Sequence, residues 1–111
     1  MLFRSLNLDE AGAYIKKAIE LDGDNPAYLD SLGWYYFKTG KFEEARRELL
    51  NAISKMSEED ATVLEHLGDT YEQLGNLREA LDQWRRALKL EPENADKLRE
   101  KIEAAKKKQG A

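Results

Sequence analysis

One eight-residue pattern occurs twice in this 111-residue chain, and no other feature constrains the fold as strongly. Both copies read Leu-x-x-Leu-Gly-x-x-Tyr, at residues 29–36 and at residues 64–71. A glycine and two alanines follow each copy at the same distances, and these are Gly40, Ala45 and Ala52, then Gly75, Ala80 and Ala87. Because self-similarity at a fixed period is typical of chains that stack copies of one unit, the sequence predicts a repeat architecture.

Apolar side chains recur three and four residues apart in six segments, which is the pattern of amphipathic helices. Gly40 suits a tight turn between two such helices, where it can adopt a positive φ. Asn76 with Glu79, and Asn7 with Glu10, have the spacing of N-terminal capping pairs. The predicted helices cover residues 6–21, 26–38, 42–55, 61–74, 77 to just before Pro92, and 94–108.

The first predicted helix belongs to the same repeat series, because Ala11 and Ala18 align with Ala45 and Ala52. It corresponds only to the second half of a unit. The last predicted helix has a narrow apolar stripe and charged outer faces, as the terminal helix of a stack requires. We therefore expect a single domain over residues 1–111, with a half repeat at 6–25, full repeats at 26–60 and 61–94, and a capping helix at 95–108.

At these positions the chain resembles the tetratricopeptide repeat family, whose unit of about 34 residues carries W-x-x-L-G-x-x-Y, A-x-x-x-F and P. Leucine replaces the first Trp in both units, and Ser57 stands where the first unit would have Pro. Trp84, Tyr36 and Tyr71 occupy packing columns of the motif, and we expect them in the core. The matching residues are Leu29, Leu32, Gly33, Tyr36, Ala45, Leu49 and Ala52, then Leu64, Leu67, Gly68, Tyr71, Ala80, Trp84, Ala87 and Pro92.

The resemblance implies an all-α fold, a right-handed α-solenoid of helix-turn-helix repeats with a C-terminal capping helix. The first predicted helix has no preceding helix to complete its repeat unit. The chain is therefore expected to be the C-terminal part of a longer array. In this family the first helix of each unit lines a concave face that receives a peptide or a helix of a partner. Carried over by alignment, the lining residues are Ala27, Asp30, Trp34, Phe37, Lys38, Thr62, Glu65, Asp69, Glu72 and Gln73.

Two properties of this face suggest its ligand. Trp34 and Phe37 are aromatic at positions that core packing does not require, and four of the other lining residues are acidic. We therefore expect a protein segment with Lys or Arg beside an apolar anchor that rests on Trp34. In the alternative interpretation, the carboxylates are a solvated helix face and the aromatic rings pack against the capping helix or a neighbouring repeat.

The sequence gives little support for a catalytic, metal or cofactor site. The chain has no cysteine, and its one histidine, His66, has no second imidazole with which to bind a metal. No nucleophile elbow, phosphate loop or histidine-centred triad occurs. We expect a protein that is not an enzyme and has no cofactor or metal.

Charge and hydropathy bear on partners and compartment. The net charge of −4 argues against nucleic-acid binding. No stretch is apolar enough for a membrane span or a signal peptide, so we expect a soluble chain without a membrane partner, and the compartment stays unknown.

The unmatched first helix leads to a second hypothesis. If no helix precedes it, apolar atoms of Leu8, Ile15 and Ile19 would be partly exposed, and the protein would form homo-oligomers through this end. In that structural alternative, the chain associates with itself or packs within a longer protein, and the concave face binds no ligand.

Overall fold

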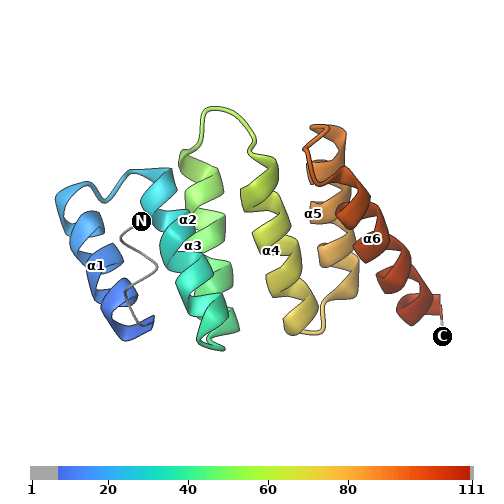
Figure 1. The fold of residues 1–111 in the computed structure, drawn as a ribbon, viewed down its shortest axis with the longest axis horizontal. Coiled ribbons are helices and arrows are strands. Elements are labelled where there is room, and N and C mark those ends of the chain that lie inside the picture. The colour runs from blue at the N-terminus through green and yellow to red at the C-terminus, as the bar shows by residue number, and fades with distance from the viewer. Residues whose placement is uncertain (1–7, 111) are drawn as a thin grey trace. The chain divides into compact units, whose positions relative to one another are not determined.

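The structure is a computed structural model that describes residues 8–110. Over this range the chain forms six helices and no strand (Figure 1). The predicted helix types are confirmed, and so is the all-α helical-repeat fold. Residues 6 and 7 of the first predicted helix lie outside the described residues. The predicted capping pair of Asn7 with Glu10 therefore falls outside them at Asn7. The helices are α1 (Leu8–Leu21), α2 (Pro26–Lys38), α3 (Phe42–Lys55), α4 (Ala61–Gln73), α5 (Leu77–Lys89) and α6 (Ala95–Gly110).

The chain divides into two compact units, with the boundary between Ser57 and Glu58. Unit 1 contains α1, α2 and α3, and unit 2 contains α4, α5 and α6. The boundary falls in the loop that the sequence predicts between the two full repeats. The assignment of the whole chain to a single domain stays a prediction.

In unit 1, local sequence signals begin and end α2. Asn25 is the N-cap, and its side chain accepts a hydrogen bond of 2.9 Å from the backbone N–H of Ala27. Pro26 follows at the first helical position, where a missing N–H has no cost. After α2, Gly40 adopts a φ of 80°, as predicted, and the chain turns into α3.

A small residue lets α2 and α3 approach closely. A Cβ atom on Gly33 would lie only 2.7 Å from Cγ of Leu49 on α3. Leu49 is fully buried, as are Ala45 and Ala52 on the same helix. Glycine on α2 is therefore matched with a large residue on α3.

Unit 2 repeats this arrangement with a larger side chain. A Cβ atom on Gly68 of α4 would collide with the indole ring of Trp84 on α5. Trp84 is fully buried, which confirms its predicted place in the core. Tyr36 in unit 1 and Tyr71 in unit 2 are only partly buried, so the predicted place in the core is not reached by the two tyrosines.

The capping prediction for α5 is wrong in one respect. Asn76 is the N-cap residue, but its side chain makes no capping hydrogen bond. Its ψ of 72° differs from the extended backbone of Asp60, whose ψ is 121° and whose side chain caps α4. The tight turn through Gly75 sets this geometry, because the Asn76 N–H donates to the carbonyl of Tyr71 at 2.9 Å.

Candidate partner-binding surfaces

An aromatic pair lies on the α2 face of unit 1. The rings of Trp34 and Phe37, one helical turn apart, stack with centroids 4.6 Å apart and planes 9° from parallel. Phe37 also meets Phe42 of α3 edge to face, with centroids 5.4 Å apart. Because Trp34 and Phe37 are only partly buried, together they form a stacked apolar platform at the surface.

A cation already lies over this platform. The Nζ atom of Lys38 is 4.8 Å from the centroid of the Trp34 ring, within the range of a cation–π interaction. Of the other predicted lining residues on α2, Ala27 is exposed and Asp30 is partly buried. Asp30 lies one turn before Trp34, so the α2 face combines an aromatic surface, a carboxylate and a movable cation.

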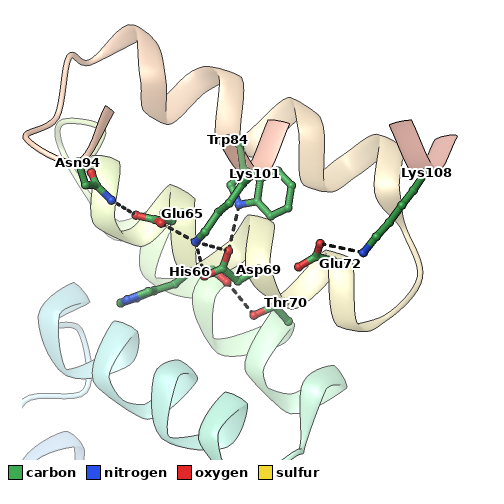
Figure 2. A network of polar contacts seen from close by, with 9 residues as sticks. All are labelled: Glu65, His66, Asp69, Thr70, Glu72, Trp84, Asn94, Lys101 and Lys108. Atoms are coloured by element: carbon green, nitrogen blue, oxygen red, sulfur yellow. Dashed lines mark hydrogen bonds and ion pairs between the residues drawn. The ribbon is translucent and has the colours of Figure 1, made fainter. Parts of the chain in front are cut away.

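The α4 face of unit 2 is organised differently, around Lys101 of α6 (Figure 2). The Lys101 ammonium donates to Oε2 of Glu65 at 2.6 Å and to both carboxylate oxygens of Asp69 at 2.9 and 3.1 Å. Asn94 donates to the other oxygen of Glu65 at 2.6 Å. The indole N–H of Trp84 donates to Asp69 at 3.1 Å. We call these five residues the Lys101 cluster. The cluster ties α4 to α5 and to α6.

Burial and hydrogen bonding shift the pKa values of the three charged groups in this cluster. Partial burial favours the neutral form of Glu65, but hydrogen bonds from Lys101 and Asn94 outweigh it and lower the pKa of Glu65. Asp69 is more deeply enclosed, and there burial prevails over Lys101 and raises the pKa of Asp69. Burial opposes the charge on Lys101, yet hydrogen bonds to the two carboxylates raise the pKa of Lys101. The ammonium is therefore held in its charged form.

The remaining predicted residues of α4 are more open. Thr62 and Gln73 are exposed. The Glu72 carboxylate lies 3.9 Å from the Nζ atom of Lys108 on α6, at the limit of an ion pair. Three of the four predicted acidic residues thus have a lysine of α6 beside them, which the sequence analysis missed. One signal was available, since Lys101 occupies the repeat column of Leu32 and Leu67.

The hypothesis about the first helix needs a correction. Ile15 is buried, with 9% of its surface exposed, because it lies on the side of α1 that faces α2. Ile19 is partly buried, and the side chain of Leu8 lies outside the described residues. The large apolar residues of α1 that are exposed, among those whose side chains the structure describes, are instead Tyr14 and Leu21.

The described helices provide neither a membrane span nor a metal site. No helix within residues 8–110 has both the length and the apolar character needed to cross a bilayer. In the same part of the chain, no three histidine or acidic side chains gather as they would around a metal ion.

Paired helices, glycine contacts and alanine columns define an α-helical repeat protein. Two family models, each described as tetratricopeptide repeat, match residues 2–61 and 61–94. The chain therefore belongs to the tetratricopeptide repeat family, and the resemblance inferred from the motif is confirmed.

One curated relative is the TPR repeat-containing protein PA4667 of Pseudomonas aeruginosa, which is 39% identical over 66 residues. This match covers 60% of the present chain but only 11% of the length of the relative. The function of that whole protein therefore cannot be carried over.

Solved structures with the same fold include complexes with peptides. The first TPR of Spaghetti (RPAP3), bound to the HSP90 peptide SRMEEVD, has a TM-score of 0.85 and 23% identity, covering 94% of this chain and 81% of that one. The Yersinia enterocolitica chaperone SycD, in complex with a peptide of the translocator YopD, has a TM-score of 0.85 and 18% identity, covering 96% and 86%. At these identities the likeness establishes the fold alone.

Proposed function

We propose that this chain is a non-catalytic module that binds a segment of a partner protein on its repeat helices. The observation that carries the proposal is the stacked Trp34–Phe37 pair on α2, which presents apolar surface that the core of unit 1 does not enclose. The peptide complexes of Spaghetti and SycD support a binding role for this fold. Rigid helix pairs hold the binding residues in place, so little conformational entropy is lost on association.

The chemistry of the α2 face favours a ligand with a positive charge beside an apolar anchor. Lys38 over Trp34 is an internal example of such a contact, since an ammonium already rests against this ring. A lysine or arginine of the ligand would take the place of Lys38, with Asp30 one turn away. The acidic HSP90 peptide SRMEEVD in the Spaghetti complex would meet repulsion from the Asp30 carboxylate.

A second candidate role, structural packing, is favoured by the Lys101 cluster. Glu65 and Asp69 belong to the predicted ligand-lining set, yet their side chains are only 16% exposed and both contact Lys101. In unit 2 these carboxylates hold α6 in place. We therefore assign ligand capture mainly to the α2 face, and to α4 only through its more open residues Thr62, Glu72 and Gln73.

A selection experiment tests the proposed function. A random peptide library displayed on phage is selected on the wild-type chain and, in parallel, on a Trp34→Ala variant. We expect peptides with Lys or Arg beside a large apolar residue, and binding about tenfold weaker to the variant. Leu50→Ala, which removes a 42% exposed leucine from α3 instead, is the control and should leave binding unchanged. Enrichment that is equal on wild type and Trp34→Ala would overturn the proposal.

A further inference from the structure

Each unit has a tryptophan with a lysine ammonium over its ring, but the two ammonium groups are held differently. The Nζ atom of Lys101 lies 5.9 Å from the centroid of the Trp84 ring, and two carboxylates of α4 accept hydrogen bonds from it at 2.6 and 2.9 Å. The Nζ atom of Lys38 lies 4.8 Å from the centroid of the Trp34 ring. Within residues 8–110, no carboxylate pairs with Lys38, so the ring is the group that holds this ammonium.

The two tryptophan–lysine pairs also differ in exposure. Trp84 is fully buried and the side chain of Lys101 is 34% exposed, so moving this ammonium away would leave two enclosed carboxylates without their cation. Trp34 is only partly buried, and Lys38 is an exposed residue at the last position of α2. The Lys38 ammonium can therefore leave the Trp34 ring for water without breaking an ion pair. The contact in unit 1 is exchangeable, whereas the contact in unit 2 is structural.

We propose that Lys38 is an internal competitor for the binding site on α2, because its ammonium occupies the Trp34 ring until a cationic side chain of the partner segment displaces it. The inference rests on the proposed function, in which that segment binds the stacked Trp34–Phe37 pair. Each bound ligand then replaces an existing cation–π contact with a new one. At the ring, only the difference between the two contacts contributes to the affinity.

That difference favours arginine over lysine in the partner segment. A ligand lysine exchanges one ammonium for another, so the contact with the ring is unchanged. A guanidinium is planar and more weakly hydrated than an ammonium, and it stacks on aromatic faces. The Trp34 and Phe37 rings are already within 9° of parallel, so a guanidinium would add a third layer to this stack. The partner segment should therefore carry Arg, rather than Lys, beside its apolar anchor.

The strength of a cation–π contact sets the size of the effect. At an exposed site the contact is favoured over its absence by a factor of about two to five. The Trp34 ring is then open in about a third to a sixth of the molecules, and the affinity for a cationic ligand is reduced by the same fraction. Removing the competitor should therefore tighten binding about threefold to sixfold.

Occupancy of the ring by Lys38 can be measured without a ligand. Proton NMR of the full chain should show the ε-methylene protons of Lys38 shifted upfield by the ring current of Trp34, and the shift should disappear in Trp34→Ala. Lys38 protons that resonate in the wild-type chain where those of a solvated lysine do would overturn the proposal.

Variants of Lys38 test the competition. The probe is the peptide most enriched on wild type in the selection described above, synthesised with Arg, Lys or Gln at its cationic position, and its binding is measured by isothermal titration calorimetry. Lys38→Ala should bind the Arg and Lys peptides about threefold to sixfold more tightly than wild type does, and the Gln peptide equally. On wild type, the Lys peptide should exceed the Gln peptide by less than about twofold, and the Arg peptide should bind about threefold more tightly than the Lys peptide.

Two further variants separate occupancy of the ring from net charge. Lys38→Arg keeps the charge but introduces a stronger competitor, so the Arg peptide should bind about twofold more weakly. Lys41→Ala is the matched control, because it removes the charge of an exposed lysine three residues further along the chain, and it should change binding by less than about twofold. Equal effects of Lys38→Ala and Lys41→Ala, with binding still dependent on Trp34, would overturn this inference alone. Binding that does not depend on Trp34 would overturn the proposed function and this inference together.

Discussion

The Lys101 cluster allows a quantitative test of what holds unit 2 together. In the variant Lys101→Met, the aliphatic part of the side chain stays over Trp84, whose ring centroid lies 5.9 Å from the ammonium of Lys101. The variant removes the ammonium that donates to both Glu65 and Asp69, together with its charge, and leaves each carboxylate with one neutral donor, Asn94 or Trp84. Two neighbouring carboxylates are then left without their cation, while the apolar packing of α6 is largely kept.

The expected loss lies between two limits. An exposed ion pair contributes up to about 1 kcal/mol, and breaking a fully buried pair costs about 3–5 kcal/mol. The carboxylate side chains are 16% exposed, but Lys101 is 34% exposed, so solvent screens part of the interaction. We therefore expect Lys101→Met to reduce the free energy of unfolding by about 2 kcal/mol at neutral pH, which is roughly a thirtyfold change in the folding equilibrium.

The assay is urea unfolding followed by circular dichroism and by tryptophan fluorescence, measured in a Trp34→Phe background so that the signal comes from buried Trp84. Lys106→Met is the matched control, because Lys106 on the same helix makes only an exposed pair with Glu103, at 3.4 Å. Its loss should stay below about 0.5 kcal/mol. Adding Glu65→Gln and Asp69→Asn to Lys101→Met should recover most of the stability, because no uncompensated charge then remains. If Lys101→Met costs no more than Lys106→Met, the cluster does not hold α6 in place and the reasoning is refuted.

Two further predictions concern packing and pH. Gly68→Ala should lower the free energy of unfolding by about 1–2 kcal/mol in the same urea assay. The added methyl group collides with the fully buried Trp84 ring, and this cost outweighs the gain in helix propensity. A stabilised variant would contradict the close packing of Gly68 against Trp84. The pKa of Lys101 is raised above its ordinary value of 10.5, so its contribution to stability should be complete below that pH and lost as pH rises through the folded-state pKa. Unfolding free energies measured across this range should therefore fall more steeply for wild type than for Lys101→Met.

Local patterns explain why the helices could be predicted so closely. The ranges 26–38 and 42–55, read from apolar spacing, Pro26 and Gly40, are those of α2 and α3 in the structure. The repeat also shows that Gly33 and Leu49 recur as Gly68 and Trp84, and the structure packs each glycine against the large residue of its own unit. Such signals depend on neighbours a few residues away, and they carry over directly into helix bounds and packing columns.

The turn at Asn76 shows where local reasoning failed. Capping chemistry predicts a hydrogen bond from the residue type and spacing alone, whereas the backbone angles that allow it are set by the turn between α4 and α5. Asn25 and Asp60 follow longer connections, have extended backbone and form their caps. The same residue type at the same helix position thus behaves differently because the preceding turn differs.

By itself, the sequence determined the helices, the repeat and the family, because the helices follow from apolar spacing of three and four residues and the repeat and family from one motif that recurs a unit apart. Only the tertiary structure decided which charges of the predicted binding face already have partners. Lys101 reaches Glu65 and Asp69 across 36 and 32 residues of chain, and that contact depends on how far α6 lies along α4. It also decided that Ile15 is buried and Leu21 exposed, since the two residues lie on different sides of α1 and α2 packs against the side that carries Ile15.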